Sequence, residues 1–97
     1  VHIHVLSPIT MAEDLEMYML TVQPKGALHS AAHTLRTEEF LTVLEGSIRV
    51  CAGDNKVELN TGDFIHYHAD IAHSIENPTD NEARVYMVVR FQKARWE

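Results

Sequence analysis

Three residues of types that bind divalent metals, His33, Glu39 and His73, lie close to segments with strand character. His33 stands six residues before Glu39, which opens an apolar segment that ends at a glycine turn. Imidazole nitrogen and carboxylate oxygen are common ligands of divalent metals, and two histidines with one carboxylate leave further coordination positions open. The three residues therefore indicate either a metal site or a metal-free, hydrogen-bonded polar pocket.

The elements that must position these residues have the pattern of β-strands. Residues 1–5 alternate strictly between apolar and histidine side chains, and helical character is confined to residues 10–16. Residues 39–52 are interpreted as a hairpin that turns at Glu45 and Gly46. The spacing and the turn residues predict an all-β sandwich or barrel of about eight strands. The expected strands are residues 1–6, 15–22, 39–44, 47–52, 56–60, 64–68, 73–77 and 84–91.

Length and composition predict a single domain over residues 1–97. An apolar content of 45% is enough for a folded core and argues against disorder. The net charge of −6 and the lack of a basic cluster argue against direct nucleic-acid binding, and no apolar run is long enough to span a membrane. The single cysteine, Cys51, fits a reducing cytoplasm. Because the chain begins with Val1 and not with methionine, we expect it to be the C-terminal part of a longer chain.

Two motifs resemble those of the cupin superfamily. Glu39, six residues and Gly46 match the end of the first cupin motif. Gly62, ten residues, His73, three residues and Asn77 match the spacing of the second motif. The resemblance implies a double-stranded β-helix, the cupin jelly-roll barrel. From its place just before Pro78, we expect Asn77 to make backbone hydrogen bonds that fix the strand of His73 and the turn that follows it.

The first motif departs from the common cupin pattern. Leu35 stands where many cupins have the second histidine, so the resemblance carries over three metal ligands: His33, Glu39 and His73. This one-histidine variant is similar to the C-terminal sensor cupins of helix-turn-helix (XRE-type) transcriptional regulators. The resemblance implies a cytoplasmic homodimer that binds a small-molecule effector and contacts DNA only through a separate N-terminal domain. Zinc is the first choice of metal, and iron, nickel and manganese are the alternatives.

Other interpretations remain open at this stage. A stand-alone metal-dependent isomerase or dioxygenase would use the same three ligands, with His66 or Tyr67 as the proton-transfer group. A metal-free binding or dimerisation module would use them for structure alone. His29, His66 and His68 are interpreted as surface residues, with an additional metal ligand as the alternative for each.

Overall fold

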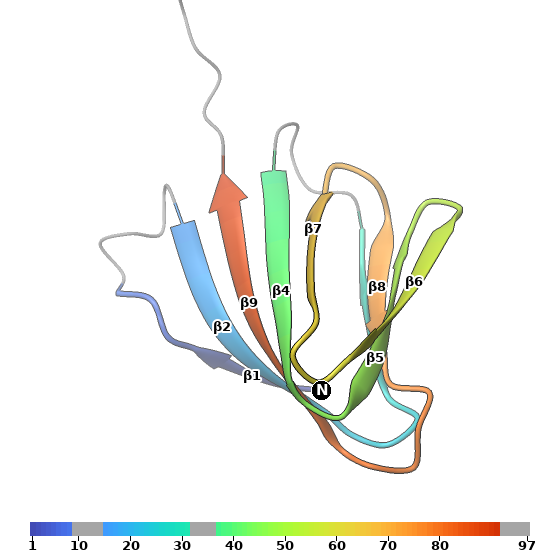
Figure 1. Ribbon diagram of the computed structural model, residues 1–97. Helices are drawn as coiled ribbons and strands as arrows, with labels where there is room; N and C mark the ends of the chain where they lie inside the picture. The colour runs from blue at the N-terminus through green and yellow to red at the C-terminus, as the bar shows by residue number, and fades with distance from the viewer. Residues whose placement is uncertain (9–14, 32–36, 92–97) are drawn as a thin grey trace, which may run out of the picture.

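The computed structural model describes residues 1–8, 15–31 and 37–91, which form nine β-strands in two antiparallel sheets. One sheet has the strand order β1-β2-β9-β4-β7, and the other has the order β3-β8-β5-β6 (Figure 1). This confirms the predicted all-β jelly roll. The strands are β1 (His2–Val5), β2 (Leu15–Val22), β3 (Ala27–Ser30), β4 (Thr37–Glu45), β5 (Ser47–Ala52), β6 (Asn55–Asn60), β7 (Phe64–His68), β8 (His73–Glu76) and β9 (Ala83–Phe91).

The predicted hairpin over residues 39–52 is wrong. Strand β4 pairs with β7 and β9, whereas β5 pairs with β6 and β8 in the other sheet. Gly46, at a positive φ of 86°, lies in the turn that carries the chain from one sheet to the other. The residues 45–46 therefore mark a turn correctly, but a turn signal does not say whether the strands on its two sides pair.

Two further differences concern short segments. Strand β3 was not predicted, because its four residues contain two polar side chains and lack a clear alternation. The segment with expected helical character, residues 10–16, lies mostly outside the described residues, and its last two residues begin β2. No helix in the described part of the chain is long and apolar enough to cross a membrane.

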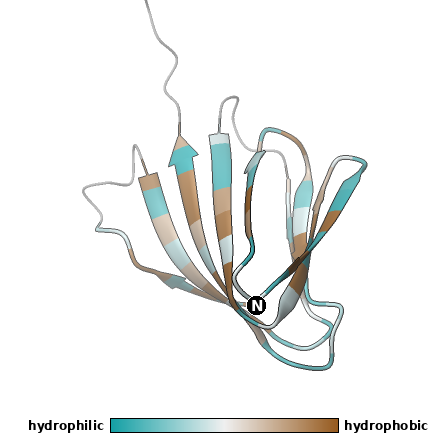
Figure 2. Ribbon diagram, viewed as in Figure 1, coloured by the Kyte–Doolittle hydropathy of each residue, from teal (hydrophilic) through white to brown (hydrophobic). Residues whose placement is uncertain are grey.

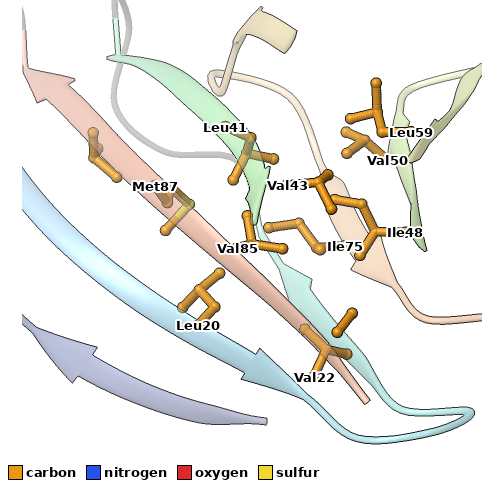
Figure 3. Close-up of a cluster of buried hydrophobic side chains, with 12 residues drawn as sticks. Leu20, Val22, Leu41, Val43, Ile48, Val50, Leu59, Ile75, Val85 and Met87 are labelled. Carbon is orange, nitrogen blue, oxygen red and sulfur yellow. The ribbon is translucent and has the colours of Figure 1, made fainter. Parts of the chain in front are cut away.

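The core lies between the two sheets and draws on strands of both. Figure 3 shows Leu20, Leu41 and Val85 on one side of this cluster, with Ile48 and Ile75 on the other. Leu20, Leu41 and Val85 have no exposed surface, and burying a side chain of this kind stabilises a fold by about 1.5–3 kcal/mol. The brown apolar segments in Figure 2 recur along the strands of both sheets, as expected for strands that bury alternate residues.

The two sheets converge at the end that carries the turns 45–46 and 61–63, and they diverge toward the other end (Figure 1). This convergent end is held by backbone hydrogen bonds from Gly62 N to Val43 O, at 2.8 Å, and from Val43 N to Asp63 O, at 3.0 Å. At the divergent end, β4 and β8 begin and β7 ends, so this end carries the ends of strands from both sheets (Figure 1).

Candidate metal and ligand site

Glu39 and His73 form a buried pair between the two sheets. Glu39 is the third residue of β4 in one sheet, and His73 is the first residue of β8 in the other. The Nε2 atom of His73 lies 3.1 Å from Oε2 of Glu39, and the two side chains are only 2% and 3% exposed. Ionisable side chains are this deeply buried only when they are paired or bind a metal. The pair is therefore the candidate functional site at this end of the barrel.

Tyr67 supports Glu39 from the neighbouring strand. It lies opposite Glu39 in the β4–β7 register, and its hydroxyl donates a short hydrogen bond to Oε1 of Glu39. Burial, followed by the negative charge of Glu39, raises the pKa of Tyr67 far above its ordinary value of 10.0. Tyr67 therefore remains a protonated donor that fixes one carboxylate oxygen and leaves the other facing His73.

A backbone carbonyl fixes the orientation of the His73 ring. Nδ1 of His73 lies 2.8 Å from the carbonyl oxygen of Ile71, and this oxygen can only accept a hydrogen bond. The proton of the neutral imidazole therefore resides on Nδ1, and the lone pair on Nε2 faces Glu39. Two acceptor atoms this close need either a second proton on the ring or a cation between them.

In the metal-free protein a second proton on the ring would satisfy this requirement. The hydrogen bond with Glu39 is the main cause that raises the pKa of His73 above its ordinary value of 6.5, and burial opposes the rise. The raised pKa favours the doubly protonated ring, which donates from Nε2 to the carboxylate.

The pair also fits the alternative, a divalent metal. Two ligand atoms that each lie about 2.1 Å from one metal are separated by about 3.0–3.4 Å at octahedral to tetrahedral angles. The observed 3.1 Å falls within that range. The hydrogen bonds from His73 Nδ1 and to Glu39 Oε1 are of the kind that orient metal ligands.

The predicted third ligand, His33, lies outside the described residues. The structure brings Glu39 and His73 together, as expected. Because His33 is not described, the three-ligand site stays a prediction. Within residues 1–8, 15–31 and 37–91, no group of three or more His, Cys, Asp or Glu side chains is placed to share a metal ion.

His66 and His68 lie on the opposite face of the sheet from Glu39. The register pairs them with Phe40 and Glu38, whose side chains alternate with that of Glu39 along β4. The His66 ring stacks on Phe40 with 4.4 Å between centroids, and its Nε2 lies 3.0 Å from Oε1 of Glu38. These two histidines are therefore surface residues, as expected.

Glu38 and Arg90 form an ion pair that the sequence analysis did not identify. Nε of Arg90 donates to Oε2 of Glu38 at 2.8 Å, and the Glu38 side chain is 7% exposed. This ion pair depends on the register between β4 and β9, which places Arg90 opposite Glu38. His29, the remaining candidate, is exposed on β3.

A cavity of about 230 Å³ extends from Glu39 between the sheets. Strands β1, β2, β4 and β9 form one wall, and β3 and β8 form the other. Most of the lining is apolar, and Glu39 is the one ionisable carboxylate among the residues that line it. The lining residues are Ile3, Tyr18, Leu28, Ser30, Glu39, Ile75, Met87, Val89 and Phe91.

Asn77 has the structural role expected of it. Its amide nitrogen donates to the carbonyl oxygens of Val22, at 3.0 Å, and Asn81, at 2.7 Å. Its side-chain oxygen accepts a hydrogen bond from the backbone N–H of Thr79 at 3.0 Å. The side chain, which belongs to a residue only 1% exposed, thus ties the end of β8 to β2 and to the loop before β9.

Comparison with known proteins agrees with this architecture. The family model described as "Cupin domain" matches residues 18–89. An HTH_3 family transcriptional regulator from Vibrio cholerae superimposes with a TM-score of 0.85 at 27% identity, covering 94% of this chain and 51% of that protein. The chain therefore spans about half the length of that regulator. The search of curated proteins found no match.

Two other solved structures are similar in fold. The Cupin_2 domain of an XRE family transcriptional regulator from Enterobacter cloacae has a TM-score of 0.87 at 13% identity, covering 95% of this chain and 97% of that one. The EutQ protein of Clostridium difficile has a TM-score of 0.74 at 16% identity, covering 92% of this chain and 61% of that one. At such identities the likeness concerns the fold alone.

Proposed function

The chain belongs to the cupin family, and we propose that it is the metal-containing sensor domain of a cytoplasmic helix-turn-helix transcriptional regulator. The observation that carries the proposal is the buried Glu39–His73 pair, which borders a mostly apolar cavity. The likeness to the regulator of Vibrio cholerae supports the regulatory part of the proposal.

The metal would be held by His73 and Glu39, with His33 as the third ligand. Zinc suits two imidazoles and one carboxylate, and iron, nickel or manganese are the alternatives. A divalent ion bound in this way acts as a Lewis acid and accepts an oxygen ligand in an open coordination position. Tyr67 and the Ile71 carbonyl would keep the two described ligands in place as the effector enters or leaves.

Proton-transfer chemistry, which the enzyme alternative requires, has little support at this site. His66 lies on the outer face of the sheet, paired with Glu38. Tyr67 lies on the inner face, but its raised pKa makes it a poor base near neutral pH. A binding role needs neither residue as an acid or a base.

Regulation would require only that the effector binds one conformation of the full-length protein better than another. A coupling free energy of about 1–3 kcal/mol between the effector site and the DNA-binding site is typical of such proteins. We propose that DNA is contacted by a separate N-terminal domain, because this acidic chain, with a net charge of −6, lacks a basic footprint.

Elemental analysis of the purified protein tests the metal site. We expect close to one equivalent of metal in the wild-type protein and a loss of nearly all of it in His73→Ala and Glu39→Gln. His66→Ala is the matched control, because it removes a histidine from the outer face of the same barrel and should leave the metal content unchanged. Wild-type protein that carries no metal and cannot be loaded would refute the proposed site.

The regulatory part is tested separately. The full-length gene should encode a helix-turn-helix segment upstream of Val1, and the encoded protein should bind DNA with an affinity that depends on effector. A gene that begins at this domain, or a product that turns over substrates in a His73-dependent way, would instead favour an enzyme.

A further inference from the structure

The shape and lining of the cavity restrict the chemistry of the effector. We infer that it is a small monocarboxylate with an uncharged, mainly aliphatic body, whose carboxylate faces the Glu39–His73 pair while the body fills the cavity. This inference rests on the proposed metal-containing sensor function and names the ligand class for it.

The volume sets an upper limit on size. A cavity of about 150 Å³ lined by apolar side chains accommodates benzene. The cavity beside Glu39, at about 230 Å³, is about one and a half times as large. By that scale it holds about nine non-hydrogen atoms, which is well below the size of a nucleotide or a drug-sized ligand.

The lining selects an apolar body. Val89 of β9 lies on one wall of the cavity, and the paired residues Leu28 of β3 and Ile75 of β8 lie on the other. None of the three side chains offers a hydrogen bond to a ligand. A polar or charged group placed among them would lose its hydration without compensation. Apart from Glu39, the polar side chains of the lining are the hydroxyl-bearing residues Tyr18 and Ser30, so a second carboxylate or an ammonium group on the ligand body would lack a charged partner.

The charge balance at the other end selects a carboxylate. A divalent metal held by the neutral imidazole of His73 and the single carboxylate of Glu39 would have a surplus positive charge. An anionic oxygen ligand in an open coordination position neutralises this surplus, whereas an ammonium group would be repelled by it. The polar and apolar ends of the site thus match the two ends of a short fatty acid or a branched-chain acid.

Isothermal titration of the metal-loaded protein with hexanoate tests this inference. Hexanoate lies within the size limit and should bind, and it should raise the Tm by several degrees at saturating concentration. Three related compounds should each bind at least about tenfold more weakly. Hexan-1-amine has a positive head group, hexanedioate has a second charge on its body, and dodecanoate is too long for the cavity.

Two substitutions of exposed strand residues locate the binding. Ile3, which is 47% exposed, lines the cavity from β1, so Ile3→Trp should weaken hexanoate binding at least about tenfold by filling the space. Val57 is 41% exposed on β6, whose residues do not line the cavity, so Val57→Trp should leave binding unchanged. Equal effects of the two substitutions would overturn the location.

The outcomes separate this inference from the proposed function. Metal-loaded protein that prefers hexan-1-amine or hexanedioate would overturn the ligand class and leave the metal site standing. If the protein cannot be loaded with metal, the proposed metal site fails and the monocarboxylate class is overturned with it, because Glu39 would then face the cavity without the surplus positive charge that favours a carboxylate. Metal-loaded protein that binds none of the four compounds would overturn the ligand class alone.

Discussion

Nε2 of His73 lies 3.1 Å from Oε2 of Glu39, although 34 residues of chain and a change of sheet separate the two. Each side chain has a second hydrogen bond that orients it toward the other. Nδ1 of His73 donates to the Ile71 carbonyl oxygen, and Oε1 of Glu39 accepts from the Tyr67 hydroxyl. The pair is therefore oriented before any ligand binds. Such preorganisation lowers the entropic cost of binding, for a metal ion as for an organic ligand.

Replacing Tyr67 with phenylalanine should weaken metal binding without removing it. The substitution deletes the hydrogen bond to Oε1 of Glu39 and keeps the aromatic ring, so the carboxylate loses its orientation and not its charge. Loss of a partner of this kind typically lowers metal affinity by about 10–100-fold. Competition with a chromogenic chelator measures the affinity.

Tyr86→Phe is the control for that experiment. Tyr86 lies between the buried residues Val85 and Met87 on β9, so its side chain faces the outer side of the sheet, away from Glu39. An equal loss of affinity in both variants would show that Tyr67 has no specific role in orienting the carboxylate.

Part of this site can be predicted from the sequence, because alternate residues of a strand lie on opposite faces of the sheet. Residues 39–44 and 84–91 are predicted as strands, and the resemblance to the cupin motifs implies that Glu39 and His73 share one site. The hydrogen bond from Tyr67 could not be predicted, because it depends on the β4–β7 register, which sets the partner of each residue across strands. The ion pair of Glu38 with Arg90 depends on register in the same way, here between β4 and β9.

The error at residues 45–46 has a related origin. A glycine with positive φ permits a sharp turn in either a hairpin or a corner between sheets. Which of the two forms depends on the partners that β4 and β5 find far along the chain, namely β9 and β8. Local sequence carries no information on that competition. Strand β3 was missed because its identity as a strand comes from pairing with β8.

The stability of the metal-free protein should fall as the pH rises above about 6.5. The hydrogen bond with Glu39 raises the pKa of His73 in the folded protein above the unfolded value, so the folded state binds its proton more tightly. The resulting stabilisation is fully present below the unfolded pKa and is lost as the pH rises through the folded pKa.

Urea unfolding of chelator-treated protein at a series of pH values measures this dependence. The difference in unfolding free energy between the wild type and His73→Gln isolates the contribution of His73 from that of other titrating groups. A difference that stays constant between about pH 6 and about pH 9 would contradict the expected linkage. Metal affinity should have the opposite pH dependence. It should fall at low pH, because protons compete with the metal for Nε2 of His73.

Asn77→Ala should destabilise the fold by roughly 2–4 kcal/mol, because it removes the donor to the buried Val22 carbonyl and three further hydrogen bonds. Urea unfolding measures the loss. Lys56→Ala, an exposed change on β6, should alter the stability by less than about 0.5 kcal/mol. If Asn77→Ala is equally mild, the motif residue holds β8 in place less firmly than its contacts indicate.

The edge of the five-stranded sheet makes a specific prediction about assembly. Strand β1 lies at this edge and pairs with β2, and its apolar residues Ile3 and Val5 are 47% and 56% exposed. An exposed, apolar edge strand is a template for pairing with another chain. We therefore expect the protein to be a homodimer that pairs or packs through β1.

Val5→Lys should convert this dimer to a monomer, because a lysine on an edge strand would have to be buried when a second chain pairs with that edge. Val57→Lys, on the exposed edge strand β6 of the other sheet, is the matched control and should leave the dimer intact. Light scattering coupled to size-exclusion chromatography gives the mass of each variant. A wild-type monomer, or a dimer that only Val57→Lys disrupts, would rule out β1 as the contact.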